Sequence, residues 1–262
     1  MKAISFSLSR MACRALILLS GILVSLGLFA ERSAAQPDPD PCRPVRFADS
    51  AFVVCTVDLR QYDVRLFWRG PDGDVLGSFS RLKDTPEGSR LALAMNAGMY
   101  HEDHSPVGLY VENGKELKAA NTRSGPGNFH LKPNGVFFVK GNRAGVLETD
   151  TYLKRKIRPD YATQSGPMLV INGRIHPKFS EQSTSLKIRN GIGVKDQHTV
   201  VFAISDDPVT FSAFARLFRD HLGCANALFL DGSVSSLYAP ALERMDSLLP
   251  MGPIVGALRR RP

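Results

Sequence analysis

The stretch ANALFLDGSVSS (residues 225–236) joins an apolar run to a polar turn. The apolar run predicts a buried strand, and the Asp231-Gly232 pair that follows it predicts a turn. Three serines lie in the same turn. A strand that ends in this way presents a carboxylate and several hydroxyls on a loop held by a rigid element, where functional groups are often displayed.

Further short apolar runs predict strands elsewhere in the chain. They cover residues 51–59, 63–68, 91–95, 107–112, 136–139, 168–171 and 200–204, and a further predicted strand that contains Gly193 follows residues 189–191. One helix is predicted after a cap at Thr210 or Ser212, because five apolar residues up to Leu222 fall on one face, with Gly223 as terminator. Its aromatic stripe indicates core packing. These elements predict a single α+β domain with mixed or antiparallel β-sheet and a few packed helices.

The first residues have the pattern of a secretory signal peptide. Basic residues precede an apolar run over residues 15–30, and small residues at 33–35 fit a cleavage site. A transmembrane anchor is the alternative, but about 16 apolar residues are few for a bilayer span. We therefore expect a signal peptide over 1–35, no stable membrane anchor after its cleavage, and a periplasmic or secreted protein.

The rest of the chain divides into a proline-rich N-terminal arm over residues 36–50 and a domain over 51–262, and 44% apolar content is enough for a core. The net charge of the chain is +8; residues 1–35 hold four basic residues and one acidic residue, which leaves 29 basic and 24 acidic residues, or +5. No basic patch with interleaved aromatic residues occurs. The sequence therefore predicts no nucleic-acid partner, and its mild excess of positive charge suits an anionic substrate.

Three cysteines follow the predicted signal peptide. Cys42 and Cys55 lie close in sequence, and an exported protein meets an oxidising compartment, so we expect a disulfide between them. Cys224 lies in an apolar stretch and is expected to be a buried free thiol; a catalytic role is the alternative.

Three polar residues beside apolar runs are candidates for chemistry, and each has an ordinary structural interpretation. Asp231 could be a desolvated acid, base or metal ligand, or a turn residue that caps backbone amides. Asn96 precedes Ala97-Gly98, where a ligand can approach closely, or it is a turn asparagine. Arg189 could bind phosphate or carboxylate through its planar fork, or it is a surface charge.

Other motifs of known mechanism are missing. His101-Glu102-Asp103-His104 does not have the spacing of a zinc protease motif, so a polar loop beside a pocket is favoured over a metal site there. The serine at 165 lies outside a nucleophile elbow, and no phosphate-binding or dinucleotide-binding glycine motif occurs. No cofactor is therefore certain, a divalent metal stays open, and the metal ligands are unknown.

An ordered set of motifs resembles the phosphodiester glycosidase family. The set comprises Asn96 within MNAG (95–98), PVGL (106–109), SGPML (165–169), RNGIG (189–193) and LDGSVSS (230–236). This chain has Ser233 and Val234 where the family often has further glycines. Each motif alone is unspecific, and their order carries the resemblance.

The resemblance implies a hydrolase that cleaves the bond between a sugar and a phosphodiester, with a carbohydrate or sugar-phosphate substrate. It implies that Asp231, Arg189 and Asn96 are catalytic, with Asp231 as base or metal ligand and Arg189 on the phosphate. The expected substrate-binding residues are Ser165, Asn190, Ser235, Ser236, Tyr100 and His104. The alternative is a non-enzymatic exported protein that binds a glycan or phosphoglycan in the same pocket.

Overall fold

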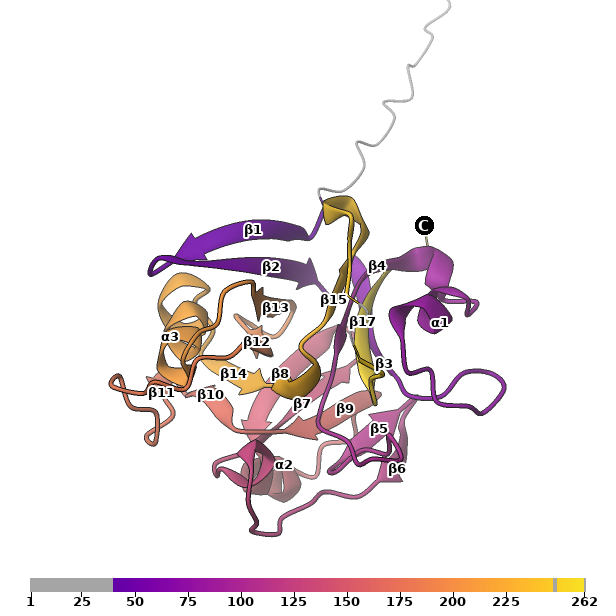
Figure 1. Cartoon of the computed structure of the whole chain (residues 1–262). Helices are drawn as coiled ribbons and strands as arrows, with labels where there is room; N and C mark the ends of the chain where they lie inside the picture. Colours follow the sequence, from indigo (N-terminus) through magenta and orange to yellow (C-terminus); the bar gives the residue numbers. More distant parts are fainter. Residues whose placement is uncertain (1–39, 247–248, 262) are drawn as a thin grey trace, which may run out of the picture. The chain divides into compact units, whose positions relative to one another are not determined.

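The computed structural model describes residues 40–246 and 249–261, and the predicted signal peptide lies outside them. Their strands form three sheets with a few short helices, as Figure 1 shows. Every strand pairing in these ranges is antiparallel. The expectation of mixed or antiparallel sheet with few helices is thus met by an all-antiparallel arrangement in which strands predominate.

The first sheet has seven strands and the other two have five each. In spatial order the first contains β1 (Cys42–Phe47), β2 (Ser50–Asp58), β13 (Thr199–Ser205), β12 (Asn190–Val194), β14 (Asn226–Phe229), β10 (Met168–Ile171) and β11 (Arg174–Ile175). The second contains β16 (Arg244–Met245), β15 (Leu237–Ala239), β4 (Leu91–Asn96), β17 (Ile254–Arg259) and β3 (Tyr62–Phe67). The third contains β6 (Lys115–Lys118), β5 (Tyr110–Glu112), β9 (Tyr161–Ser165), β7 (Gly135–Lys140) and β8 (Arg143–Glu148).

The helices are short. They are α1 (Phe79–Lys83), α2 (Thr149–Arg155) and α3 (Phe211–Arg216), and α3 continues as a π-helical turn over Leu217–His221. Short 3-10 turns cover Gly88–Arg90, Asn128–His130, Gly232–Val234 and Pro240–Leu242. All three sheets contribute apolar side chains to one main core, exemplified by Phe202 of β13, Leu93 of β4 and Phe137 of β7.

Helix α3 confirms the predicted caps. The Thr210 hydroxyl accepts a hydrogen bond from the backbone N–H of Ala213 at 3.1 Å, and Gly223 has a φ of 66°, which suits a helix terminator. The helix packs on the first sheet over the two glycines of β12. A Cβ at Gly193 would lie 2.9 Å from a Phe218 ring carbon, so the glycine allows the helix to approach.

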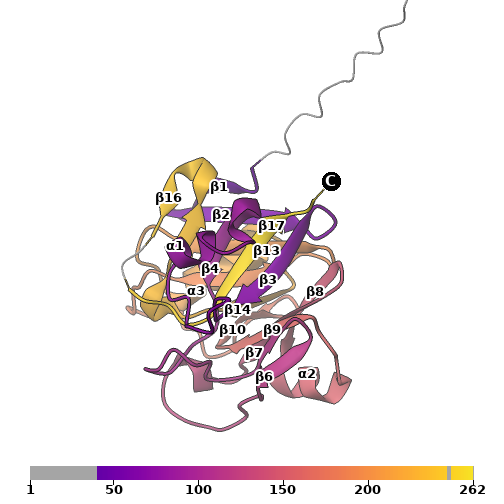
Figure 2. The same ribbon diagram turned by 90° about the vertical axis from the view of Figure 1, so that its right-hand side faces the viewer.

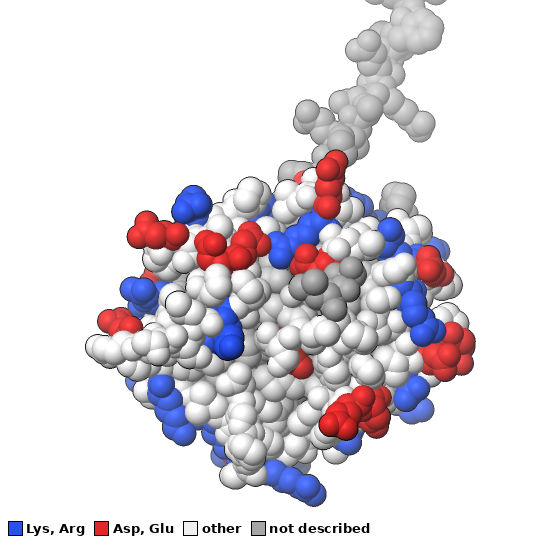
Figure 3. All heavy atoms as spheres, in the orientation of Figure 1, with Lys and Arg blue, Asp and Glu red and all other residues white. Residues whose placement is uncertain are grey.

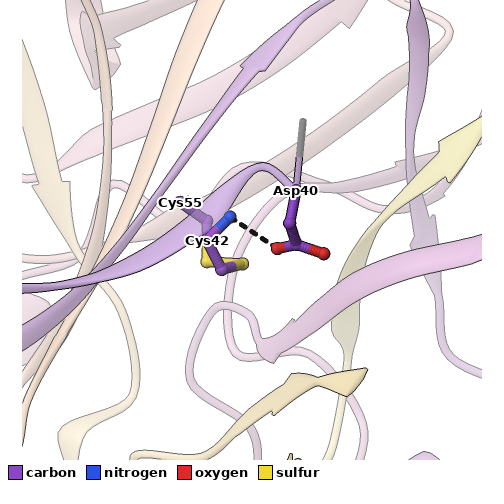
Figure 4. The surroundings of a disulfide bond; sticks show 3 residues. All are labelled: Asp40, Cys42 and Cys55. Atoms are coloured by element: carbon purple, nitrogen blue, oxygen red, sulfur yellow. Dashed lines mark hydrogen bonds between the residues drawn. A yellow bond between two sulfur atoms is a disulfide. The ribbon is translucent and has the colours of Figure 1, made fainter. Parts of the chain in front are cut away.

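Strand β1 pairs with β2, and this pairing brings Cys42 opposite Cys55. The two form the expected disulfide, and the backbone N–H of Cys42 also donates to Asp40 (Figure 4). Residues 42–47 of the predicted arm are therefore a strand of the first sheet. Cys224 is the expected buried free thiol, and burial raises the pKa of its thiol to about 12, so the unreactive thiol form predominates.

Candidate active site

The turn after β14 connects two sheets. Strand β14 belongs to the first sheet and β15 to the second, so residues 230–236 cross between them; this segment lies near the centre of Figure 1. The backbone N–H of Leu230 donates to the carbonyl of Asn190 at 3.1 Å. The N–H of Asp231 donates to the carbonyl of Ala97, also at 3.1 Å. The backbone of Asp231 is thus fixed by β12 on one side and by the end of β4 on the other.

Asn96, the last residue of β4, holds this turn with its side chain. Its amide nitrogen donates to the carbonyl of Asp231 at 2.7 Å. Its amide oxygen accepts from the side chain of Asn190 at 2.8 Å and from the backbone N–H of Ser236 at 2.9 Å. Asn96 is buried and both lone pairs of its amide oxygen are engaged. Its side chain therefore positions the turn.

Asn190 and the two serines extend the network. The Asn190 amide oxygen accepts from the hydroxyl of Ser235 at 3.0 Å, and the Ser236 hydroxyl donates to the carbonyl of Val234 at 2.7 Å. Asn190 and Ser236 are buried, and Ser235 is half-buried. The structure brings these predicted substrate-binding residues together, but their polar groups bind the protein itself, so they set the shape of the turn.

The Asp231 carboxylate is buried without a cation beside it. Only 8% of the residue is exposed, and the described residues include no salt bridge to it. The backbone N–H of Ser233 donates to its Oδ1 at 3.0 Å. Burial raises the pKa of Asp231, and the hydrogen bonds from Ser233 oppose that rise. Asp231 is therefore both a capping residue and a desolvated carboxylate.

Tyr100 lies near this carboxylate, and His104 stacks on Tyr100. Burial and then the charge of Asp231 raise the pKa of Tyr100, which places the phenol near Asp231. Its hydroxyl donates to the carbonyl of Pro250 at 2.8 Å. The ring of His104 stacks on Tyr100 with centroids 5.4 Å apart and an interplanar angle of 13°. Both residues can form a wall next to Asp231.

Arg189 immediately precedes β12, and its side chain has different neighbours from that of Asn190. Its Nε donates to the carbonyl of Val209 at 2.8 Å and its Nη2 to that of Ser185 at 3.0 Å. Its guanidinium carbon lies 3.6 Å from the ring centroid of Phe211. The residue is 2% exposed, and burial lowers its pKa to about 10, so it stays charged at neutral pH.

Arg189 meets the Asp231 turn through an aromatic ring. Its guanidinium carbon is 5.7 Å from the centroid of Phe229, and a Cβ on Gly232 would be 2.4 Å from the far carbon of the same ring. No hydrogen bond or ion pair joins Arg189 to Asn96 or Asp231 within the described ranges. The arginine is therefore a buried cation one ring away from the carboxylate.

Ser165 ends β9 and is fully buried, and its hydroxyl has no partner in the described part of the chain.

Gln164, the residue before Ser165, supports the neighbouring backbone, and sequence analysis missed it. The Gln164 side chain accepts from the backbone N–H of Leu109 at 3.0 Å and of Asn121 at 2.8 Å. A Cβ on Gly98 would lie 2.4 Å from the Gln164 carbonyl, so the segment after Asn96 lies directly against β9.

Two further contributors were also missed. Ser233 supplies the N–H that binds the Asp231 carboxylate, and Phe211 stacks on Arg189. The helical stripe indicated only that Phe211 belongs to the core, because periodicity does not show what a half-buried first residue of a helix contacts. Val234 is buried in an apolar cluster with Met251. This packing explains why the chain can hold a valine side chain at the position where the family often has a glycine.

No group of three or more His, Cys, Asp or Glu side chains suited to a metal occurs among residues 40–246 and 249–261. In the His101–His104 segment, Asp103 accepts from the N–H and hydroxyl of Ser105. His101 lines a hollow of about 370 Å³ together with Lys118 and Arg123. This geometry matches the polar loop beside a pocket that the sequence favoured.

Charged side chains lie mainly around the margin of the face drawn in Figure 3, and its middle is mostly uncharged. This is the orientation in which the Asp231 segment lies near the centre of Figure 1. Two hollows elsewhere in the described structure, of about 440 and 470 Å³, are lined by residues outside 230–236, so they are separate from this turn.

In the described part of the chain no helix has the length and apolar character needed to cross a membrane.

The fold and the ordered site residues agree with a family of glycosidases. The family model for phosphodiester glycosidases (NAGPA) matches residues 89–247, a range that includes Asn96, Arg189 and Asp231. The chain belongs to the phosphodiester glycosidase family, and this membership indicates glycosidase-type hydrolysis.

Individual relatives support the assignment. The uncharacterized protein YigE of Escherichia coli (strain K12) is 37% identical over 184 residues, which cover 70% of this chain and 72% of that protein. The catalytic domain of zebrafish N-acetylglucosamine-1-phosphodiester alpha-N-acetylglucosaminidase, auto-inhibited by its pro-peptide, matches with a TM-score of 0.58 at 15% identity over 84% of this chain and 82% of that one. A hypothetical protein from Synechocystis matches with a TM-score of 0.51 at 15% identity over 84% of this chain and 61% of that one. These two structures share the fold.

Proposed function

We propose that this protein is an exported hydrolase that cleaves the bond between a sugar and a phosphodiester in an envelope or extracellular glycan. The observation that carries the proposal is the Asp231 carboxylate, which is buried, has no cationic partner among the described residues and is fixed by backbone contacts to two sheets. Family membership supports the reaction class. The signal-like first residues and the Cys42–Cys55 disulfide support export.

The reaction needs less acid assistance than ordinary glycoside hydrolysis. Most glycosidases use two carboxylates, one of which protonates the leaving oxygen. The phosphate monoester that departs is already a good leaving group, so a site with one carboxylate is sufficient. In this proposal Asp231 takes a proton from the attacking water, the water oxygen bonds to the anomeric carbon as positive charge develops there, and the bond from that carbon to the phosphate oxygen breaks to release the phosphate monoester.

The surrounding residues have distinct roles in the proposal. Asn96 and Asn190 hold the turn so that the carboxylate has one orientation, which favours reaction through geometry. Tyr100 and His104 form a wall for the sugar. Arg189 supplies a positive charge behind Phe229, and its Nη1, which has no hydrogen bond among the described residues, is the donor left for the phosphate.

The test measures release of free sugar from sugar-1-phosphodiesters by the purified protein, with and without added divalent metal. Asp231→Asn should lower kcat by at least about a hundredfold, the lower end of the contribution of a general base. Its melting temperature should not fall, because the backbone contacts of the turn remain and a buried charge is removed. The matched control is Asp72→Asn, the same change at an exposed aspartate that pairs with Arg81, and it should keep full turnover.

Two outcomes would overturn the proposal. One is turnover that survives in Asp231→Asn. The other is saturable binding of the diester with no release of sugar under any metal condition, which would make the protein a phosphoglycan-binding protein.

A further inference from the structure

A second group of charged residues lies on the edge strand of the second sheet, away from the Asp231 turn. Asp63 and Arg65 are two residues apart on β3, so their side chains lie on the same face of the strand. Strands β3 and β17 face the viewer in Figure 2. Arg90, which precedes β4, and Arg260, which follows β17, reach the same place. We call Asp63, Arg65, Arg90 and Arg260 the arginine cluster.

Three guanidinium groups share one carboxylate in this cluster. Asp63 lies 3.0 Å from Arg260, 3.5 Å from Arg65 and 3.6 Å from Arg90. The Nε of Arg90 is buried and has no acceptor among the described residues. A single carboxylate can neither neutralise three cations nor satisfy their donors, so the cluster lacks acceptors and carries excess positive charge.

Two hollows meet at the cluster, and both are lined by Asp63, Arg65 and Arg260. One has a volume of about 530 Å³ and is also lined by Glu87, Arg90 and Arg261. Its four arginines and two acids leave a formal charge of +2. This hollow can accept an anionic group, because guanidinium groups match phosphate and carboxylate oxygens in pairs.

The other hollow, of about 440 Å³, has the features of a sugar site. Tyr161 of β9 is half-buried in its wall, and the Tyr161 hydroxyl donates to the side chain of Asn113 at 2.6 Å. Burial raises the pKa of Tyr161 and the charge of Arg65 opposes the rise, which places this arginine near the phenol. Asp160 lies in the same wall. An aromatic face beside carboxylate and amide acceptors can hold a sugar ring and its hydroxyls.

We propose that the arginine cluster and the two hollows form a second binding site, for a saccharide that carries a phosphate or carboxylate group. The anionic group binds Arg65, Arg90 and Arg260, and the sugar ring lies against Tyr161. The site shares no residue with the Asp231 turn. It holds an anionic glycan chain at a distance from the candidate active site, and it stands whether or not that turn is catalytic.

The test measures binding of glucose 6-phosphate to the purified protein by calorimetry at low ionic strength, with glucose, glucuronate and inorganic phosphate as comparison ligands. All proteins carry Asp231→Asn, so that turnover at the candidate active site does not contribute heat. We expect glucose 6-phosphate or glucuronate to bind at least about tenfold more tightly than glucose, because charge-assisted hydrogen bonds are the strong ones. Whichever of the two binds more tightly identifies the source of the anionic group.

Three variants locate the site. Arg65→Gln with Arg260→Gln should weaken binding at least about tenfold, whereas Arg43→Gln with Arg46→Gln, two exposed arginines of β1, should leave it unchanged. Tyr161→Ala should weaken binding of the sugar phosphate more than that of inorganic phosphate. Asp63→Asn removes the competing carboxylate and should tighten anion binding, a gain that misfolding would not produce.

The proposal is overturned if the Arg65/Arg260 variant binds as tightly as its parent, or if Asp63→Asn fails to tighten binding. Neither result bears on the proposed hydrolysis, which is measured separately by release of sugar.

Discussion

Asp231 and Asp63 are two carboxylates of one chain held in opposite ways. Asp231 is buried, has no ion pair within the described ranges, and is fixed through backbone and amide hydrogen bonds from two sheets. Asp63 is partly exposed on an edge strand and lies among three arginines. The comparison teaches that backbone contacts can fix a carboxylate and leave its charge uncompensated. Arginines around a carboxylate neutralise its charge instead. The first arrangement suits proton transfer, and the second suits binding of a further anion.

A substitution at Asn96 tests the difference between the Asp231 turn and the arginine cluster most directly. Asn96→Ala should lower the free energy of unfolding by about 2–4 kcal/mol, because the Asp231 carbonyl, the Ser236 N–H and the Asn190 amide lose their buried partner. Turnover should fall with it. Arg65→Gln in the arginine cluster should cost less than about 1 kcal/mol, as expected for a partly exposed ion pair. Urea unfolding of both variants measures the two costs, and equal losses would erase the distinction between the regions.

A second prediction compares the buried arginine with the exposed ones. Arg189→Met should raise KM for a sugar phosphodiester at least about tenfold, since the charge-assisted hydrogen bond from Nη1 to the phosphate is lost. The free energy of unfolding should stay within about 1 kcal/mol of the parent, because Met packs on Phe211 and a desolvated charge without an acid partner is removed. Arg43→Gln, at an exposed arginine of β1, is the control and should not change KM. An unchanged KM in Arg189→Met would leave Arg189 a purely structural residue.

Stability as a function of pH should separate the two kinds of carboxylate. Burial raises the pKa of Asp231 above its ordinary 3.8, so the folded protein holds that proton longer than the unfolded chain does. Charging Asp231 therefore lowers stability as pH rises from 3.8 through the raised value, and Asp231→Asn removes this loss. The stability of the variant relative to the parent should thus increase across that window.

The exposed pair of Asp58 and Arg60 gives the opposite sign. The hydrogen bond from Arg60 lowers the pKa of Asp58 to about 2, so the contribution of Asp58 is present above its ordinary value of 3.8 and is lost as pH falls through about 2. Asp58→Asn should therefore be destabilising at neutral pH and should match its parent at the acid end. Thermal unfolding from pH 2 to 7 measures both trends, and parallel trends in the two variants would contradict the assignment.

The smallest effect is expected at Ser165. Its hydroxyl is fully buried and has no partner in residues 40–246 and 249–261, so Ser165→Ala should change the free energy of unfolding by less than about 1 kcal/mol and is expected to be neutral or stabilising. Thr163→Ala on the same strand serves as the comparison. A clear loss of stability or of substrate affinity in Ser165→Ala would show that the hydroxyl binds a water or ligand.

Sequence could predict the strands that carry the site better than the contacts between them. The strands around Asn96, Arg189 and Asp231 follow from local apolar runs, and the Thr210 cap and Gly223 from local chemistry. Strand β1 was missed because its residues have the exposed, proline-containing pattern of an edge strand, which periodicity does not separate from an extended arm. The neighbours of the Arg189 side chain follow from its register and from the approach of α3, and neither is encoded by the motif alone.

The same limit applies to the arginine cluster. Arg65, Arg90 and Arg260 are far apart in sequence, so composition shows only a mildly basic chain. Their convergence depends on the pairing of β3 with β17, which no local pattern specifies. Arg260 follows the last strand of the sheet, and the structure pairs it with Asp63.

The crossing of residues 230–236 from one sheet to another has a consequence for how the molecule forms. Asn96 binds groups that are 94, 135 and 140 positions away along the chain. Such distant contacts form late, after the loops between them have closed. The turn can adopt its working shape only when both sheets are already in register, so a half-folded chain has its strands but no arranged carboxylate. Regain of activity during refolding should therefore trail the regain of secondary structure, and the site reports that assembly is complete.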